Sequence, residues 1–253
     1  MKLSQKTMGN GPPLVLLHGG MGSINHWHRN FDALAEHYTI HALDMPGYGE
    51  SPAVAKDMPK DDYASLMLDA LNATVPTGAF RLAGFSFGGI VAAVCAAHLG
   101  TRIHKLSLMG PGGFKWRGPP LNTKKIPHAS EGAQVMRDVL GHNLRVMMCA
   151  RPNSVTEETI DLHHANVQRT RYDGRQFSLT PGLLAKCLKG MTCPVQIIWG
   201  EKDALCYPNI QPRVDECRAA MPGIRIDAIS DAGHWVQYDA ADEVNRLLLE
   251  FLK

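Results

Sequence analysis

A serine flanked by glycines is the feature of this chain that points most directly to chemistry: Gly84-Phe85-Ser86-Phe87-Gly88. The apolar run 80–83 stops just before it, and a helix-like run, 89–99, follows. A serine on a sharp strand-to-helix turn is lifted clear of the sheet, and the glycines leave room for a backbone that larger side chains would block. The pattern predicts a nucleophile at Ser86, although an ordinary tight turn would carry the same motif.

A serine hydroxyl is a poor nucleophile at neutral pH, so it needs a base and an acid that orients the base. Asp203 follows the expected strand 195–199, and His234 follows the expected strand 224–229. Both therefore belong to the carboxyl ends of parallel strands, the edge where active sites of open α/β sheets assemble. The order serine, acid, histidine predicts a triad of Ser86, Asp203 and His234.

The acid has competitors in the sequence. Glu201, Asp227 and Asp231 lie near the same two strands. Asp227 falls within a strand, and Asp231 is too close to His234 in sequence to oppose it squarely. Asp203 is therefore the preferred acid.

Two backbone amides should face the oxyanion that forms during acyl transfer. One is expected from Phe87, the residue after the nucleophile, at a helix start where the dipole also favours negative charge. The second is expected from the loop His18-Gly19-Gly20-Met21-Gly22, which follows the first long strand. Gly20 is the preferred donor there, and Met21 is the alternative.

These residues need a scaffold, and short apolar runs alternating with amphipathic ones predict an α/β fold with a mostly parallel central sheet flanked by helices. The expected strands are Leu14–Leu17, Tyr38–Leu43, Phe80–Ala83, Ile103–Met109, Val195–Trp199 and Ile224–Ile229. The expected helices are Trp27–His37, Asp62–Val75, Phe87–Leu99, Pro208–Met221 and Asp239–Leu252.

Residues 111–190 break this rhythm. They hold helix-like segments at 131–149 and 156–171 but no convincing strand. So long a stretch without sheet character is better explained by a helical cap subdomain than by a loop. We expect a core domain formed by residues 1–110 and 191–253, with the cap inserted between them.

The chain resembles the α/β-hydrolase superfamily over nearly its whole length. The resemblance rests on His18-Gly19-Gly20, Asp44 through Ser51, Gly84 through Gly88, Asp203 within Gly200-Glu201-Lys202-Asp203, and Gly233-His234-Trp235. It implies an α/β-hydrolase fold with a helical cap and a serine hydrolase activity. Within the superfamily, His18 to Phe31, Met109 to Gly113 and Gly233 to Trp235 are similar to the meta-cleavage-product hydrolases, which cut a carbon-carbon bond in products of aromatic-ring degradation.

Two departures from that subfamily bear on the substrate. It has an asparagine before the nucleophile, where this chain has Phe85, and a cap arginine near the position of His163 or His164. Arg169 or Arg171 are possible substitutes for the arginine. The resemblance implies substrate contacts at Met21, Phe85, His163 and Trp235. Candidate pocket walls in the cap are Phe114, Trp116, Met147 and Phe177.

The charge balance limits the classes of binding partner to expect. The whole chain carries 26 basic and 24 acidic residues, so nothing indicates binding to nucleic acid or to a membrane surface. Residues 111–190 hold twelve Lys and Arg against six Asp and Glu, a balance that could attract a carboxylate-bearing substrate, although solvated helix surfaces are the preferred explanation. Six scattered cysteines and the absence of an apolar leader favour a soluble cytoplasmic protein.

Other motif classes are weak here. There is no complete dinucleotide fingerprint, P-loop or H-E-x-x-H, and His26, His28, His163 and His164 lack the companions of a metal site. We therefore expect no metal and no cofactor. The leading hypothesis is a serine hydrolase of small carboxylic esters, followed by a carbon-carbon hydrolase on the same framework. A non-catalytic ligand-binding or sensor protein is a third possibility. The oligomeric state is left open, with a homodimer possible.

Overall fold

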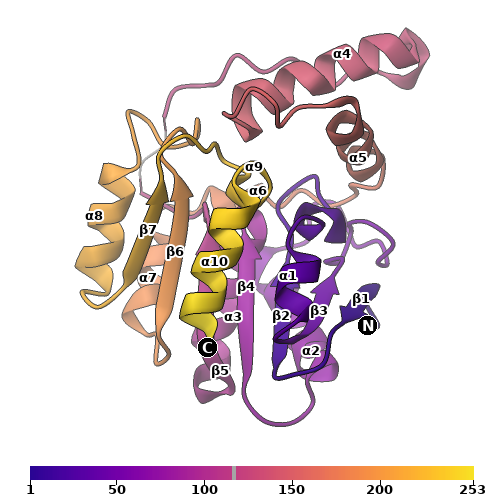
Figure 1. Ribbon diagram of the computed structural model, residues 1–253. Helices are drawn as coiled ribbons and strands as arrows, with labels where there is room; N and C mark the ends of the chain where they lie inside the picture. Colours follow the sequence, from indigo (N-terminus) through magenta and orange to yellow (C-terminus); the bar gives the residue numbers. More distant parts are fainter. Residues whose placement is uncertain (116–117) are drawn as a thin grey trace.

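A computed structural model describes residues 1–115 and 118–253. Its centre is a seven-stranded sheet in the order β1-β3-β2-β4-β5-β6-β7 (Figure 1). All neighbouring strands run parallel except β1, which pairs with β3 in the antiparallel sense. The carboxyl ends of β2, β4, β6 and β7 therefore meet at one edge of the sheet. The fold is the α/β-hydrolase fold expected from the sequence.

The six expected strands are present with small shifts at their ends. The central strands β2, β4 and β6 are largely buried because helices cover both faces of the sheet, whereas β7 at the edge is only partly buried. The bounds are β2 Pro13–Leu17, β3 Thr39–Leu43, β4 Phe80–Phe85, β5 Ile103–Met109, β6 Val195–Gly200 and β7 Arg225–Ile229. A seventh strand, β1 (Gln5–Met8), was not expected, because its residues are mostly exposed and it pairs only at the edge of the sheet.

Helices form one layer on each face of the sheet (Figure 1). One buried cluster unites the sheet with α2, α3, α7 and α8, and the other unites it with α1, α9 and α10. The bounds are α1 Phe31–Ala35, α2 Lys60–Thr74, α3 Phe87–Leu99, α7 Leu183–Lys189, α8 Gln211–Ala220, α9 Val236–Asp239 and α10 Ala241–Leu252. Short 3₁₀ turns lie at Ile24–Trp27, Gly100–Arg102 and Ala129–Glu131.

Two expected helices are divided. The range 27–37 contains only α1, preceded by the 3₁₀ turn, and Asn30 caps α1 without a side-chain hydrogen bond. The expected helix 239–252 is interrupted at Ala240: its first residue, Asp239, ends α9, and α10 begins at Ala241. By contrast, α3 has the bounds expected from its apolar run.

Above the carboxyl edge of the sheet lie α4 (Ala133–Asn143), the π-helical turn Leu144–Met148 and α5 (Glu157–Gln168) (Figure 1). The chain then returns to the core through α6 (Arg175–Ser178) and α7. Although α7 lies within the range expected to form the cap, it packs against α3 and α8. Among the described residues, none of the helices combines the length and the apolar character that crossing a membrane requires.

Candidate active site

Ser86 occupies the turn between β4 and α3. Its backbone has φ 51° and ψ −110°, an uncommon conformation for a residue with a side chain. A Cβ on Gly84 would lie 2.3 Å from the carbonyl oxygen of Gly88, and one on Gly88 would lie 2.2 Å from that of His18. The two glycines therefore allow the close chain approach that lifts Ser86 above the sheet.

Ser86, His234 and Asp203 form a continuous chain of hydrogen bonds. The Nδ1 of His234 lies 2.8 Å from Asp203 Oδ2, and its Nε2 lies 2.8 Å from Ser86 Oγ. A carboxylate only accepts hydrogen bonds, so Nδ1 carries the proton and Nε2 accepts the bond that the serine hydroxyl donates. This tautomer leaves Nε2 ready to take the proton of Ser86.

Asp203 is buried, and burial by itself would raise its pKa. The charge of His234 and its hydrogen bond oppose that effect, as do the amide of Leu205 at 2.9 Å and the charge of Arg213. Together they hold the pKa of Asp203 below its usual range. The carboxyl group is therefore ionised at neutral pH and stabilises a positive charge on His234.

The three competing acids have other surroundings. Asp227 pairs with Arg225 at 2.9 Å and accepts a hydrogen bond from Gln196. Asp231 pairs with Arg151 at 2.9 Å, and Glu201 is exposed. Among the acids considered, Asp203 is the one hydrogen-bonded to His234.

The loop after β2 lies beside the serine. Met45 donates its amide to His18 Nε2 at 3.0 Å, so His18 Nδ1 donates to the carbonyl oxygen of Gly19 at 2.8 Å. The amide of Gly19 in turn donates to Nδ1 of His26 at 3.1 Å. Two buried imidazoles thus fix this loop from both sides, and burial lowers the pKa of each.

Gly20 and Phe87 lie next to each other across the serine. A Cβ on Gly20 would be 3.8 Å from Phe87 Cβ, and both residues line the same cavity as Ser86. Met21 lines this cavity too and has a positive φ of 50°. The structure thus brings the expected oxyanion-loop residues to the serine.

Two cavities meet at Ser86 and His234. The smaller has a volume of about 270 Å³, and the larger about 650 Å³. Ser178 and Leu205 line both, whereas Gly20, Met21, Phe85 and Phe87 line the larger alone. A bound substrate can thus extend from the serine in two directions.

Phe85 is fully buried beneath the site. Its ring centre is 5.1 Å from that of His234 and 5.4 Å from that of His26. A Cβ on Gly19 would come within 2.7 Å of the same ring. The residue before the nucleophile therefore offers the larger cavity an apolar surface.

The two other expected substrate contacts, His163 and Trp235, line neither cavity. Trp235 is fully buried, donates its indole N–H to the carbonyl oxygen of His26 at 3.0 Å and stacks on Tyr238. His163 is buried on α5, and burial lowers its pKa to about 4. Both side chains are buried.

The arginine candidates differ in position. Arg171 lines the larger cavity and donates to the carbonyl oxygens of Gly49 at 2.9 Å and Ser51 at 3.0 Å. Arg169 lies outside it and pairs with Glu50 at 3.1 Å. Lys56 and Arg175 also line the larger cavity, and sequence reasoning did not single them out.

The residues expected to form the pocket walls lie in different places. Phe114 lines the smaller cavity and Met147 the larger, whereas Phe177 is buried in the core cluster. Trp116 lies outside the described residues. Within 1–115 and 118–253, no three His, Cys, Asp or Glu side chains come together as a metal site would require.

Sequence reasoning missed two residues at the centre of the site. Gly110, with φ 45°, lies over the triad: a Cβ there would be 3.2 Å from His234 Nδ1 and 3.3 Å from Asp203 Oδ2. Its signal was the glycine-rich stretch after β5. Ser178 gave no signal, because α6 is a single short turn that neither periodicity nor a motif reveals.

Comparisons with known proteins find hydrolases that resemble this chain in sequence or in fold. A 2-hydroxy-6-oxononadienedioate/2-hydroxy-6-oxononatrienedioate hydrolase of Burkholderia vietnamiensis is 30% identical over 95% of this chain and 86% of its own. A carboxylesterase of Bacillus subtilis superposes with a TM-score of 0.76 at 19% identity, covering 100% of this chain and 92% of that one. A meta-cleavage product hydrolase of Pseudomonas fluorescens IP01 gives 0.77 at 19% identity, covering 99% and 93%.

A family model matches the chain as well. The model describes the alpha/beta hydrolase family, and it matches residues 14–247, which include nearly all of β2, the turn at Ser86, Asp203, His234 and most of α10. Taken with the seven-stranded sheet and the hydrogen-bonded serine, histidine and aspartate, this match shows that the chain belongs to the alpha/beta hydrolase family.

Proposed function

We propose that this protein is a serine hydrolase that cleaves a small carboxylic ester through an acyl-enzyme. The observation that carries the proposal is the hydrogen-bond chain from Ser86 through His234 to Asp203, with both bonds at 2.8 Å. A serine so paired with a neutral imidazole is an activated nucleophile. The same observation argues against a non-catalytic binding or sensor protein.

In the proposed reaction, Ser86 Oγ attacks the ester carbonyl carbon while His234 Nε2 takes the hydroxyl proton. Asp203 stabilises the resulting imidazolium, and the amides of Phe87 and Gly20 are the proposed donors to the oxyanion. The intermediate collapses, the carbon-oxygen bond breaks, and His234 gives its proton to the leaving alcohol. Water, deprotonated by His234, then attacks the acyl-enzyme and releases the carboxylic acid and free Ser86.

Phe85 supports ester cleavage over carbon-carbon cleavage. The carbon-carbon route requires the enzyme to handle a proton on a dienol substrate before attack, and a polar group beside the nucleophile suits that step. Here the position carries a buried phenyl ring that lines the larger cavity. Neither His163 nor His164, the residues expected near the subfamily's arginine, lines either cavity, whereas Arg171, a possible substitute, lines the larger one.

Carbon-carbon cleavage is the second candidate, and one observation favours it. The Burkholderia vietnamiensis relative, 30% identical, is named as a hydrolase of dienedioate substrates. The Ser86–His234–Asp203 arrangement serves either reaction. We propose a carboxylate-bearing substrate in both cases, supported by Lys56 and Arg171 at the larger cavity, where Arg175 is paired with Asp173.

A fluorophosphonate probe tests the serine chemistry. We expect it to label wild-type protein at Ser86 and to leave Ser86→Ala unlabelled, with circular dichroism showing that the variant is folded. Turnover of p-nitrophenyl acyl esters should fall by at least about 10³-fold in the variant. Absence of labelling in the folded wild type would refute the hydrolase and favour a binding protein.

The ester and carbon-carbon routes are separated by their substrates. Wild-type kcat/KM should be higher for p-nitrophenyl acyl esters than for a ring-cleavage dienone acid, each measured by its absorbance change. Higher efficiency on the dienone would reverse the order of the two candidates while leaving the roles of the triad in place.

A further inference from the structure

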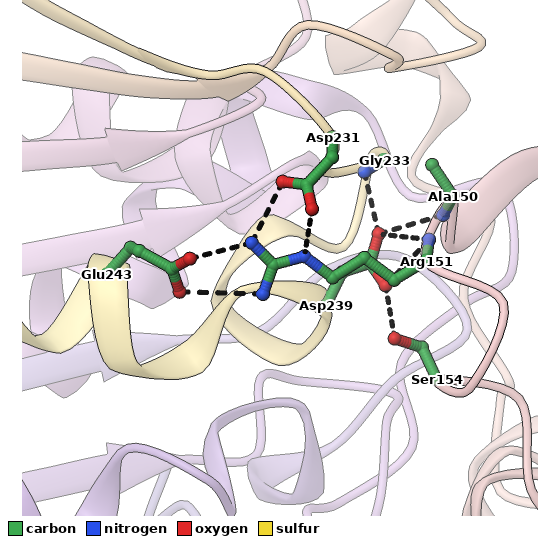
Figure 2. A network of polar contacts seen from close by, with 7 residues as sticks. All are labelled: Ala150, Arg151, Ser154, Asp231, Gly233, Asp239 and Glu243. Carbon is green, nitrogen blue, oxygen red and sulfur yellow. Dashed lines mark hydrogen bonds and ion pairs between the residues drawn. The ribbon is translucent and has the colours of Figure 1, made fainter.

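The carboxylate of Asp239, at the end of α9, is buried among hydrogen-bond donors from two separate parts of the chain (Figure 2). From the His234 loop, the amide of Gly233 donates to it at 2.7 Å. From the segment after the π-helical turn, it accepts the amide of Ala150 at 2.8 Å, the amide of Arg151 at 3.3 Å and the hydroxyl of Ser154. One side chain thus joins the loop that carries His234 to residues 148–154, which we call the cap base.

The backbone repeats this connection on the other side of His234. The amide of Trp235 donates to the carbonyl oxygen of Met148 at 2.7 Å. A Cβ on Gly233 would lie 2.8 Å from both that oxygen and the amide nitrogen of Ala150. The residues immediately before and after His234 are therefore both held against 148–150, and Met148 itself lines the larger cavity.

A second, outer layer of the same connection is ionic. The guanidinium of Arg151 pairs with Asp231 at 2.9 Å and with Glu243 at 2.7 Å (Figure 2). Asp231 begins the His234 loop, and Glu243 lies in the first turn of α10. These side chains are partly exposed, so water and salt weaken the pairs, and the buried carboxylate of Asp239 is the stronger restraint.

We propose that Asp239 is a positioning residue, which fixes His234 relative to Ser86 by tying its loop to the cap base. This inference rests on the proposed function, because positioning matters only if His234 is the base. Asp239 touches neither the substrate nor the reacting atoms. It acts through the amide of Gly233, whose place in the chain decides where the imidazole of His234 can sit.

The test compares Asp239→Asn with a matched control, Asp227→Asn. The asparagine keeps the size of the side chain but places an NH₂ group opposite hydrogen-bond donors. Asp227 is an ion-paired aspartate whose partners are Arg225 and Gln196, on β7 and β6. Each variant is titrated with a fluorophosphonate, so that kcat is expressed per reactive serine. This normalisation removes the effect of any unfolded fraction.

We expect kcat per titrated site to fall roughly 10- to 100-fold in Asp239→Asn, since about 1 Å of misplacement has costs of that order. KM should stay within about threefold, because the cavity walls other than Met148 are untouched. Asp227→Asn should lower thermal stability yet leave kcat per site unchanged. A wild-type kcat per site in Asp239→Asn would overturn the inference.

If Asp239→Asn does not fold, Ser154→Ala decides, because it removes a single donor to the carboxylate. A fall of about threefold or more in kcat per site, at unchanged KM, supports the positioning role, and an unchanged kcat overturns it. Failure of the proposed function is distinct: the wild type would not be labelled at all. With labelled wild type and an unaffected variant, only the positioning role fails.

Discussion

The ring of Phe85 supports the imidazole of His234, with the two ring centres 5.1 Å apart. The same ring lies so close to Gly19 that no side chain fits there. One buried residue therefore contacts both the proposed catalytic base and the loop expected to bind the oxyanion. Its chemical character bears on which substrates the site favours.

Replacing Phe85 should change the preference between substrates. We expect Phe85→Asn to raise the ratio of dienone to ester kcat/KM by about tenfold, the value of one well-placed hydrogen bond. Phe85→Leu is the matched control, because it removes the ring without adding an amide, and its ratio should equal that of the wild type. Parallel kinetics on both substrates measure the effect. An equal shift in both variants would assign the change to lost packing instead.

The acid can be verified by comparing two aspartates close to the base. Asp203→Asn should lower ester kcat by about 10⁴-fold, because the amide favours the wrong tautomer of His234. Asp231→Asn should lower it by less than about tenfold, since that carboxylate pairs with Arg151 on the surface. Steady-state assays at neutral pH measure both. A larger loss in Asp231→Asn would reassign the acid.

Acid should destabilise the fold through His163. Burial, and then the charge of His164, lowers the pKa of His163 to about 4 from 6.5, so the folded state binds its proton less readily than the unfolded chain. The free energy of unfolding is then fully retained above about pH 6.5 and falls as the pH drops towards 4, by about 3 kcal/mol at most.

Urea unfolding near neutral pH and near pH 4 measures this loss. His163→Gln should show a shallower decline, although not a flat one, because burial also lowers the pKa of His26. Identical pH dependence in the wild type and His163→Gln would show that another group controls acid sensitivity.

The cations at the larger cavity should matter only for charged substrates. Lys56→Gln should lower kcat/KM severalfold for an ester bearing a carboxylate and leave a neutral ester unchanged, and added salt should weaken the wild-type preference. Lys189→Gln is the control, an exposed lysine on α7 that lines neither cavity. If salt affected both esters equally, electrostatic attraction would be refuted.

The sequence was sufficient to predict six of the seven strands and the close approach of the three proposed catalytic side chains. Long apolar runs predict buried strands, and the residues just after β4, β6 and β7 meet because parallel strands end at one edge. The strand β1 was not predicted because Gln5–Met8 is largely exposed and lacks an apolar run.

Cap residues were harder to place. His163 and Trp235 were expected to contact the substrate, yet each is buried and lines neither cavity. Which face of α5 turns inward depends on packing across segments far apart in the chain, such as the hydrogen bond between Ser23 and Asn166. Asp239 was missed for the same reason, since its donors come from residues 150–154 and 233.

The return of the chain to the core through α7 also defines a module that could be exchanged between relatives. Phe114 and Tyr172 are both buried in the cluster that contains α3, so they belong to the scaffold. A graft that alters the roof of the cavities should therefore replace only the stretch between these two anchors and keep residues 148–154, which hold the His234 loop. Removing everything up to Gly190 would strip α3 and α8 of a packing partner and expose their apolar faces.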